Sequence, residues 1–240
     1  MPVLTFGAAT SNNVVIADSV STDISSGTSF TWIAWHYPTT QTSGRRIFAK
    51  TNTPVTTEAE MHWWASDTND FQGTVGRVTS NAGSNTTGVN VPLNAWHYVC
   101  MTYDESAGVH IYVGNLTTNV AEAAYSGTPA VGSGATVDMN SAMTYGGDAA
   151  AFNLAYQGRI GFFGMWNRVL TLGEMLSVQF GTSIPSGNVV LHYVGYNGQG
   201  TQIDFSGNLN HGTVGGATST ATEVPIGFPH FHLQSLGTGT

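Results

Sequence analysis

Residues 96–103 read Trp-His-Tyr-Val-Cys-Met-Thr-Tyr, a run that carries apolar or aromatic side chains on both of its alternating faces. Such a run is typical of a central β-strand that is covered on both sides. Asp104 to Gly108 then supply turn-forming residues, and residues 109–113 form a second run rich in β-branched and aromatic side chains. The two runs therefore predict an antiparallel hairpin at the centre of a sheet.

Short runs of this kind recur along the chain between clusters of turn residues, which is the pattern of a sandwich or barrel with many strands. A helix is expected where Thr171-Leu172-Gly173-Glu174 matches the Ser/Thr-x-x-Glu capping box and Gly181 supplies a stop. The stretches 80–90 and 125–140 are rich in Gly, Ser, Asn and Thr and are expected to be loops. We expect strands over residues 3–6, 14–17, 29–36, 46–50, 61–65, 76–78, 96–103, 109–113, 143–145, 158–166 and 189–194.

The composition sets limits on the class of protein. The chain has 240 residues, of which 41% are hydrophobic, enough to bury a core. Only 8% are charged, against about 25% in an ordinary soluble domain. The net charge is −8 and the longest basic cluster is Arg45-Arg46, so we expect no binding to nucleic acid. The sequence has the features of neither a signal peptide nor a membrane span, so we expect a protein made in the cytoplasm without a membrane partner.

Four blocks of sequence carry a family resemblance. In chain order they are VLTFGAATSNNVVIADSVS with SFTWIAWHYPT, RRIFAK, PLNAWHYVCMTYDESAGVHIYVGN and GRIGFFGMWNRVLTLGEML. Together they resemble the laminin G-like, concanavalin A-like jelly-roll domains of bacteria and phages, with Phe30, Thr31, Trp35 and Pro38 at the positions that the family pattern expects.

The resemblance implies an all-β fold, an antiparallel two-sheet jelly-roll sandwich over residues 1–194 with one short helix near its C-terminal end. Residues 195–240 are expected to form a closing segment and a tail. Within this fold Trp35, Trp96 and Trp166 are expected to be core anchors. The segment 189–216 resembles a stretch that often precedes the first strand in relatives, but here it follows the helix. We therefore expect either a rotated chain order or a segment that closes the sandwich from the other end.

Relatives of this fold include laminarinase-type glycosidases, which aim two carboxylates at one glycosidic bond. Their Glu-x-Asp-x-x-Glu spacing is absent here, and the nearest pair is Glu58 and Glu60. Cys100 lies in the most apolar run, where a thiol is usually core packing. We therefore expect no enzyme, and a β-glucan-active glycosidase is the third of the functional alternatives.

Oxygen-rich loops raise the question of calcium. Asp204, Asn208 and Asn210 place hard oxygen donors at alternate positions around Gly207, as a calcium loop does, and relatives carry calcium. The alternative is a turn stabilised by the Asp and Asn side chains. Asp67 and Asp70 belong to a second loop of the same kind.

Residues 62–67 contain the parts of a sugar-binding site, namely aromatic rings that stack on a sugar and polar groups that bind its hydroxyls. Neighbouring strand residues face opposite ways, so Trp63 and Trp64 cannot both be core if one face of the sheet is wet. The alternative is a strand covered on both sides. The candidate glycan-binding residues are His62, Trp63, Trp64 and Asp67.

The preferred hypothesis is a non-catalytic virion protein, a capsid decoration or tail protein, found in the virion or outside the cell after lysis. It is based on the low content of charged residues and on an apolar C-terminal tail that would contact a second copy of the chain or a capsid or tail shell. The alternative is a calcium-assisted lectin that binds cell-surface glycans. The expected assembly residues are Phe228, Pro229, His230, Phe231 and His232, of which the two histidines also have the spacing of some zinc ligands.

Overall fold

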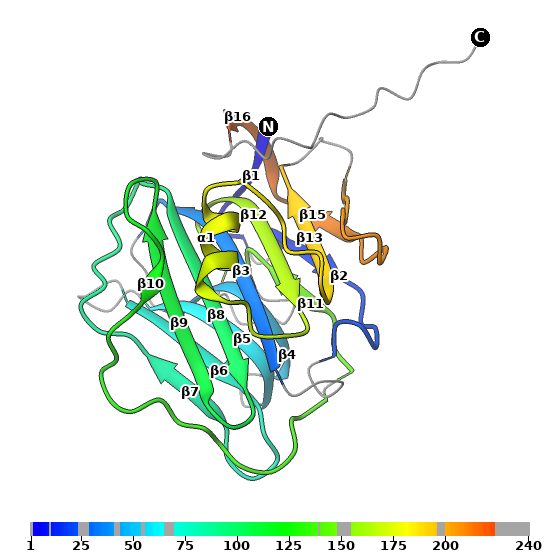
Figure 1. Cartoon of the computed structure of the whole chain (residues 1–240). Helices are drawn as coiled ribbons and strands as arrows, with labels where there is room; N and C mark the ends of the chain where they lie inside the picture. The colour runs from blue at the N-terminus through cyan, green and yellow to red at the C-terminus, as the bar shows by residue number, and fades with distance from the viewer. Residues whose placement is uncertain are drawn as a thin grey trace.

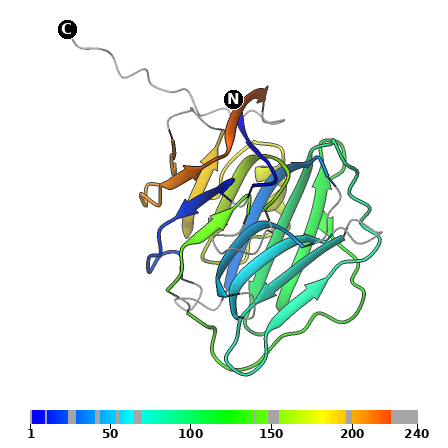
Figure 2. The ribbon, with the colours of Figure 1, turned by 180° about the vertical axis from the view of Figure 1, so that it is seen from behind.

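The computed structural model describes the chain except for residues 1, 10, 24–28, 41–43, 54–55, 65–69, 139, 148–154, 196–199 and 224–240. Its strands form two antiparallel sheets that pack face to face, as Figures 1 and 2 show from opposite sides. The predicted all-β jelly-roll sandwich is confirmed. In the described part of the chain, no helix is long and apolar enough to cross a membrane.

Each sheet has eight strands. Sheet A has the order β10 (Ala121–Glu122), β9 (Gly108–Asn115), β8 (His97–Asp104), β3 (Ser29–Pro38), β12 (Gly158–Trp166), β1 (Pro2–Phe6) and β16 (Thr218–Glu223), and β13 (Val189–Val194) also pairs with β12. Sheet B has the order β14 (Thr201–Gln202), β15 (Gly212–Gly215), β2 (Asn13–Ile16), β11 (Met143–Tyr145), β4 (Arg45–Thr53), β5 (Thr56–Trp64), β6 (Asp70–Val75) and β7 (Ala82–Asn85).

The space between the sheets is filled by stacked aromatic side chains. Trp32 of sheet A stacks on Phe48 of sheet B with ring centroids 5.1 Å apart. Phe163 and Tyr145 form a second such pair at 4.9 Å. Each large ring removes about 150–250 Å² of surface from water, so these contacts fasten one sheet to the other.

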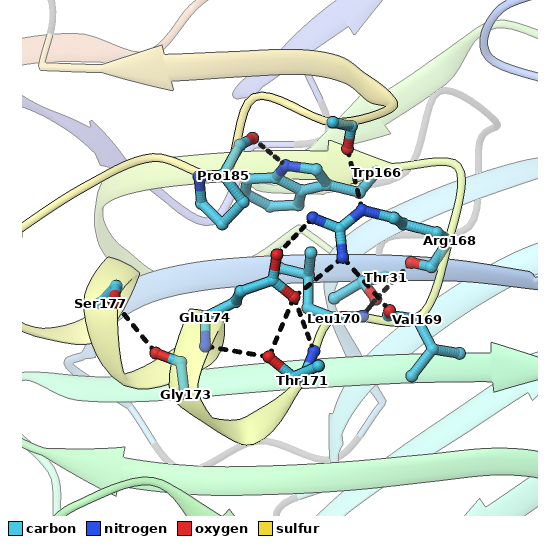
Figure 3. Close-up of polar contacts among 11 residues, drawn as sticks. Thr31, Trp166, Arg168, Val169, Leu170, Thr171, Gly173, Glu174, Ser177 and Pro185 are labelled. Atoms are coloured by element: carbon cyan, nitrogen blue, oxygen red, sulfur yellow. Dashed lines mark hydrogen bonds and ion pairs between the residues drawn. The ribbon is translucent and has the colours of Figure 1, made fainter.

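The far face of sheet A is covered by the helix α1 (Leu172–Gln179), drawn in yellow in front of the sheet in Figure 1. The predicted capping box is present, because the Glu174 amide donates to Thr171 Oγ1 and the Thr171 amide donates to the Glu174 carboxylate. Arg168 donates to both oxygens of Glu174 at 2.8 and 2.6 Å (Figure 3). These bonds lower the pKa of Glu174 to about 2, so the carboxylate that caps the helix stays charged.

The sequence-based strands β11, β12 and β13 have the expected bounds, and β8 with β9 forms the expected hairpin. The strand expected over residues 76–78 is wrong, because β6 ends at Val75 and Arg77 makes only an isolated bridge. Within the expected loop 80–90, residues 82–85 form β7. The reason is that Gly and Ser carry little strand signal of their own, whereas backbone pairing with β6 makes this segment a strand.

Two of the three expected core anchors are confirmed, since Trp35 and Trp166 are fully buried. Trp96 is a partial correction: it precedes β8 and is only partly buried, although it packs against the apolar cluster on the helix side of sheet A and edge-on against Tyr37. The end of the described chain completes both sheets, because β15 pairs with β2 and β16 pairs with β1.

A buried cation joins the loop after β2 to sheet B. Lys50 of β4 is 1% exposed, and its ammonium lies 2.5 Å from Asp23 Oδ1 and 3.0 Å from Asp18 Oδ1. Its register partners Met143 and Ala59 belong to the core. Two carboxylates thus compensate the ammonium at the end of the sandwich, where it is removed from water.

A buried histidine also lies between the sheets. His36 of β3 is 0% exposed, and its Nδ1 lies 3.1 Å from the hydroxyl of Tyr156. Burial, followed by the neighbouring His97, holds the pKa of His36 well below its usual 6.5. The folded chain therefore keeps this side chain neutral.

We predict that the free energy of unfolding falls as the pH drops below 6.5. The unfolded chain then takes up a proton on His36 at its ordinary pKa of 6.5, whereas the folded chain does not. The slope for one such histidine is at most about 1.4 kcal/mol per pH unit. Denaturant titrations from neutral pH to about pH 5 measure it. His36→Phe should show a smaller slope, and an equal slope in the variant would contradict the assignment.

Candidate functional site

A polar groove lies at the β6–β7 edge of sheet B and has a volume of about 320 Å³. Gln72 and Thr74 of β6 form part of its lining, since Phe71, Gly73 and Val75 alternate with them and point into the core. The rest of the lining comes from β7 and from a loop segment beside it. The full lining is Gln72, Thr74, Asn81, Ala82, Gly83, Ser84, Asn85, Ser126, Gly127, Thr128 and Ala130.

The wall of the groove is held to β7 by backbone hydrogen bonds at two points. The Ser126 amide donates to the Asn85 carbonyl at 2.9 Å. Gly83 and Ala130 exchange two bonds, at 2.9 and 2.7 Å. The loop segment 126–130 is therefore fastened at both of its ends and covers the edge strand of the sheet.

The chemistry of the groove is neutral. Among the described residues, its lining carries amide and hydroxyl side chains beside Ala and Gly, and none of these described residues is charged. Amides offer both donors and acceptors, and hydroxyls offer either. A volume of about 300 Å³ is at the lower end of the range of small-molecule sites. The groove is thus suited to a small neutral ligand with many hydroxyl or amide groups.

The predicted sugar-binding strand runs next to this groove. In the register of β5 and β6, His62 pairs with Gln72, Trp63 with Phe71 and Trp64 with Asp70. Glu60, of the nearest carboxylate pair, is opposite Thr74. Asp67 and the side chains of Glu58, Glu60, His62, Trp63 and Trp64 lie outside the described residues. The sequence-based glycan site and the groove are therefore neighbours in sheet B.

Sequence reasoning missed the groove residues of β7 and of the segment 126–130. Both belong to Gly/Ser/Asn/Thr-rich stretches that look like loops. The high density of amide and hydroxyl side chains in these stretches is the sequence signal that could have indicated a polar binding surface. Asp70 is a correction: it begins β6, is buried, and its Oδ1 accepts from the Val89 amide at 3.0 Å, so it belongs to a strand end rather than to an open loop.

The candidate calcium loop is held together by its own hydrogen bonds. Asp204 Oδ1 accepts from the amides of His192 and Ser206, and Oδ2 accepts from the Ser206 hydroxyl and the Asn210 amide. Asn208 and Asn210 direct their side-chain N–H groups to backbone carbonyls of β13.

An ion at this loop would have to displace these donors. The arrangement is the side-chain-stabilised turn that the sequence left open as the alternative. Calcium binding here stays a prediction. The assembly residues of the tail, Phe228 to His232, lie outside the described residues.

We predict that Asp204→Ala lowers the free energy of unfolding by about 2–4 kcal/mol, since a buried carboxylate with four donors is lost. The matched control is Asp104→Ala, whose carboxylate accepts from Ser106 and Ala107 in an exposed turn and should cost less. Denaturant titrations with calcium and with a chelator measure the effect. Stabilisation by calcium that Asp204→Ala abolishes would contradict this account and support a metal site.

The two sheets, the helix on the far face of one and the neutral groove on the other define a lectin-like jelly-roll domain. The chain belongs to the family described as the concanavalin A-like lectin/glucanases superfamily, whose model matches residues 8–175. No match was found among curated proteins.

Solved structures share this fold at low sequence identity. A candidate carbohydrate-binding protein from Bacteroides ovatus is 18% identical with a TM-score of 0.64, over 95% of this chain and 61% of that one. The enzymatically active domain of tailspike protein 2 of bacteriophage CBA120 is 9% identical with a TM-score of 0.57, over 81% of this chain and 32% of that one. The extracellular region of zebrafish Gpr126 is 14% identical with a TM-score of 0.52, over 92% of this chain and 26% of that one. This chain therefore spans less than two thirds of each of these proteins.

Proposed function

We propose that this protein is a non-catalytic recognition module that binds a neutral glycan in the groove of sheet B. The observation that carries the proposal is a lining in which most of the described residues carry amide or hydroxyl side chains and none carries a charge. Such groups match the alternating donors and acceptors of sugar hydroxyls, whereas an ionic ligand would find no counter-charge among the described lining residues. The Bacteroides ovatus protein, named for carbohydrate binding, supports the class of ligand.

The proposal makes no use of calcium, since none of the described groove residues carries a carboxylate that could hold an ion. Catalysis is not part of it either, because glycoside hydrolysis needs an acid and a second carboxylate at the scissile bond. A ligand in the groove would instead be held by hydrogen bonds to fixed strand residues. The wall segment 126–130 is fastened to β7, so little ordering of this segment opposes binding.

We predict that a glycan array identifies neutral glycans that bind the protein, and that the double variant Gln72→Ala with Asn85→Ala binds them about ten- to a hundredfold more weakly. Two neutral hydrogen-bonding side chains are lost, each worth about three- to tenfold in affinity. The matched control is Asn119→Ala, an exposed amide outside the groove. Trp63→Ala and Trp64→Ala test whether the site extends to β5.

An array without neutral binders would contradict the proposed function. Equal affinity of the double variant and the parent chain would place the site elsewhere and contradict the groove assignment.

As a second function, we propose the virion role: the module is a structural or decoration protein of a particle that assembles with copies of itself or with a shell. The phage tailspike domain, whose fold it shares, supports this proposal. The low content of charged residues supports it as well, because few long side chains must be ordered when such a surface packs. Particle location and glycan binding are compatible.

We predict that removal of residues 224–240 lowers the oligomeric state or prevents attachment to particles, because this segment carries aromatic and aliphatic residues that would pack against a partner. Light scattering and particle pull-down measure the two properties. The matched control replaces only residues 234–240, which contain no aromatic residue. Unchanged assembly and unchanged attachment after the full deletion would contradict the tail's role.

A further inference from the structure

On the outer face of sheet A, three side chains form a cluster away from the groove. Arg159 of β12 and Tyr37 of β3 are register partners, and the Arg159 guanidinium carbon lies 4.6 Å from the centre of the Tyr37 ring. Trp96 meets the same ring edge-on, with centroids 5.5 Å apart and planes at 62°. We call Tyr37, Trp96 and Arg159 the arginine–aromatic cluster.

The cluster lies on the side of the sheet that α1 covers elsewhere. Trp35, two residues before Tyr37, belongs to the apolar set beneath the helix, and alternation places Tyr37 on the same face. All three cluster side chains are nevertheless partly exposed. The helix therefore leaves this part of the face accessible, on the sheet opposite to the groove.

Arg159 differs in its surroundings from Lys50, Arg77 and Arg168. Lys50 lies between two carboxylates, Arg77 binds Glu105, and Arg168 binds Glu174. In the described part of the chain, Arg159 contacts no carboxylate and donates no hydrogen bond, and its interaction is the one with the Tyr37 ring. This unpaired guanidinium stands out in a chain with 14 acidic residues against six cations.

The arginine–aromatic cluster offers several hydrogen-bond donors. Stacking on a ring holds the guanidinium plane while its N–H edges stay free. Among the described residues the Tyr37 hydroxyl and the Trp96 indole N–H likewise have no hydrogen-bond partner. A cation with several neighbouring donors suits the two oxygens of a carboxylate, which arginine binds in a bidentate manner. The ring surfaces suit the C–H face of a sugar.

We infer that the arginine–aromatic cluster binds the carboxylate of an acidic saccharide, with the sugar ring against Tyr37 or Trp96. The donors come from side chains and not from a cradle of backbone N–H groups, which is the usual means of capturing a peptide carboxylate. This site is independent of the neutral groove, since the two have no residue in common.

The test is an array of uronic- and sialic-acid oligosaccharides printed beside their carboxyl-reduced counterparts. We expect the acidic forms to bind at least tenfold more tightly than the reduced ones, with an affinity that falls as salt rises. Arg159→Gln should lose about tenfold or more of this affinity, and Arg159→Lys, which keeps the charge without the planar fork, should lose less. Tyr37→Ala should weaken binding while Gln72→Ala, in the groove, leaves it unchanged.

Melting temperatures of the variants test whether each is folded. If Arg159→Gln does not fold, Arg159→Lys takes its place in the affinity measurement. Absence of acidic binders, equal binding of acidic and reduced forms, or full affinity in Arg159→Gln would each overturn the inference. A peptide with a free C-terminal carboxylate that competes as well as the acidic saccharides would overturn the ligand class. If neutral glycans bind in a way that depends on Gln72 and not on Arg159, and no acidic saccharide binds, the proposed function stands and this inference fails.

Discussion

The structure depends on the burial of both faces of the central strands of sheet A. In β8 every residue from His97 to Tyr103 is buried. Val99, Met101 and Tyr103 belong to the core between the sheets, whereas Tyr98 and Cys100 face the helix side. Burial there raises the pKa of the Cys100 thiol, so it stays protonated and packs as an apolar group. The helix must therefore cover this face of the sheet. Its position is fixed by the Arg168–Glu174 ion pair and by the Tyr98 hydroxyl, which donates to the Met175 carbonyl.

This covering makes the two outer faces of the sandwich different. Sheet A carries the helix, and Tyr37 and Arg159 remain partly exposed beside it. Sheet B carries polar side chains at its β6–β7 end, where a fastened loop segment turns the edge into a groove. One fold thus offers two different surfaces on opposite sheets: the groove is formed by edge-strand and loop residues, whereas Arg159 and Tyr37 belong to the central strands β12 and β3.

The sequence predicts the parts of this fold whose signal is local. Apolar runs mark β8 and β12, and the Thr171–Glu174 spacing marks α1. It does not predict β6 and β7, because the small residues in these strands are required by contacts with residues far along the chain. A Cβ on Gly73, for example, would lie 2.7 Å from the Met101 sulfur and 2.8 Å from a Val109 methyl. The sequence does not predict the two candidate sites for the same reason. Asn85 meets Ser126, and Tyr37 meets Arg159, only after the sheets have formed.

Lys50 has a practical consequence for handling the protein. It is the one lysine of the sequence, and it is 1% exposed between Asp18 and Asp23. Its amine is therefore shielded from amine-reactive reagents as long as the chain is folded. Reaction of such a reagent at Lys50 would therefore report unfolding around this side chain.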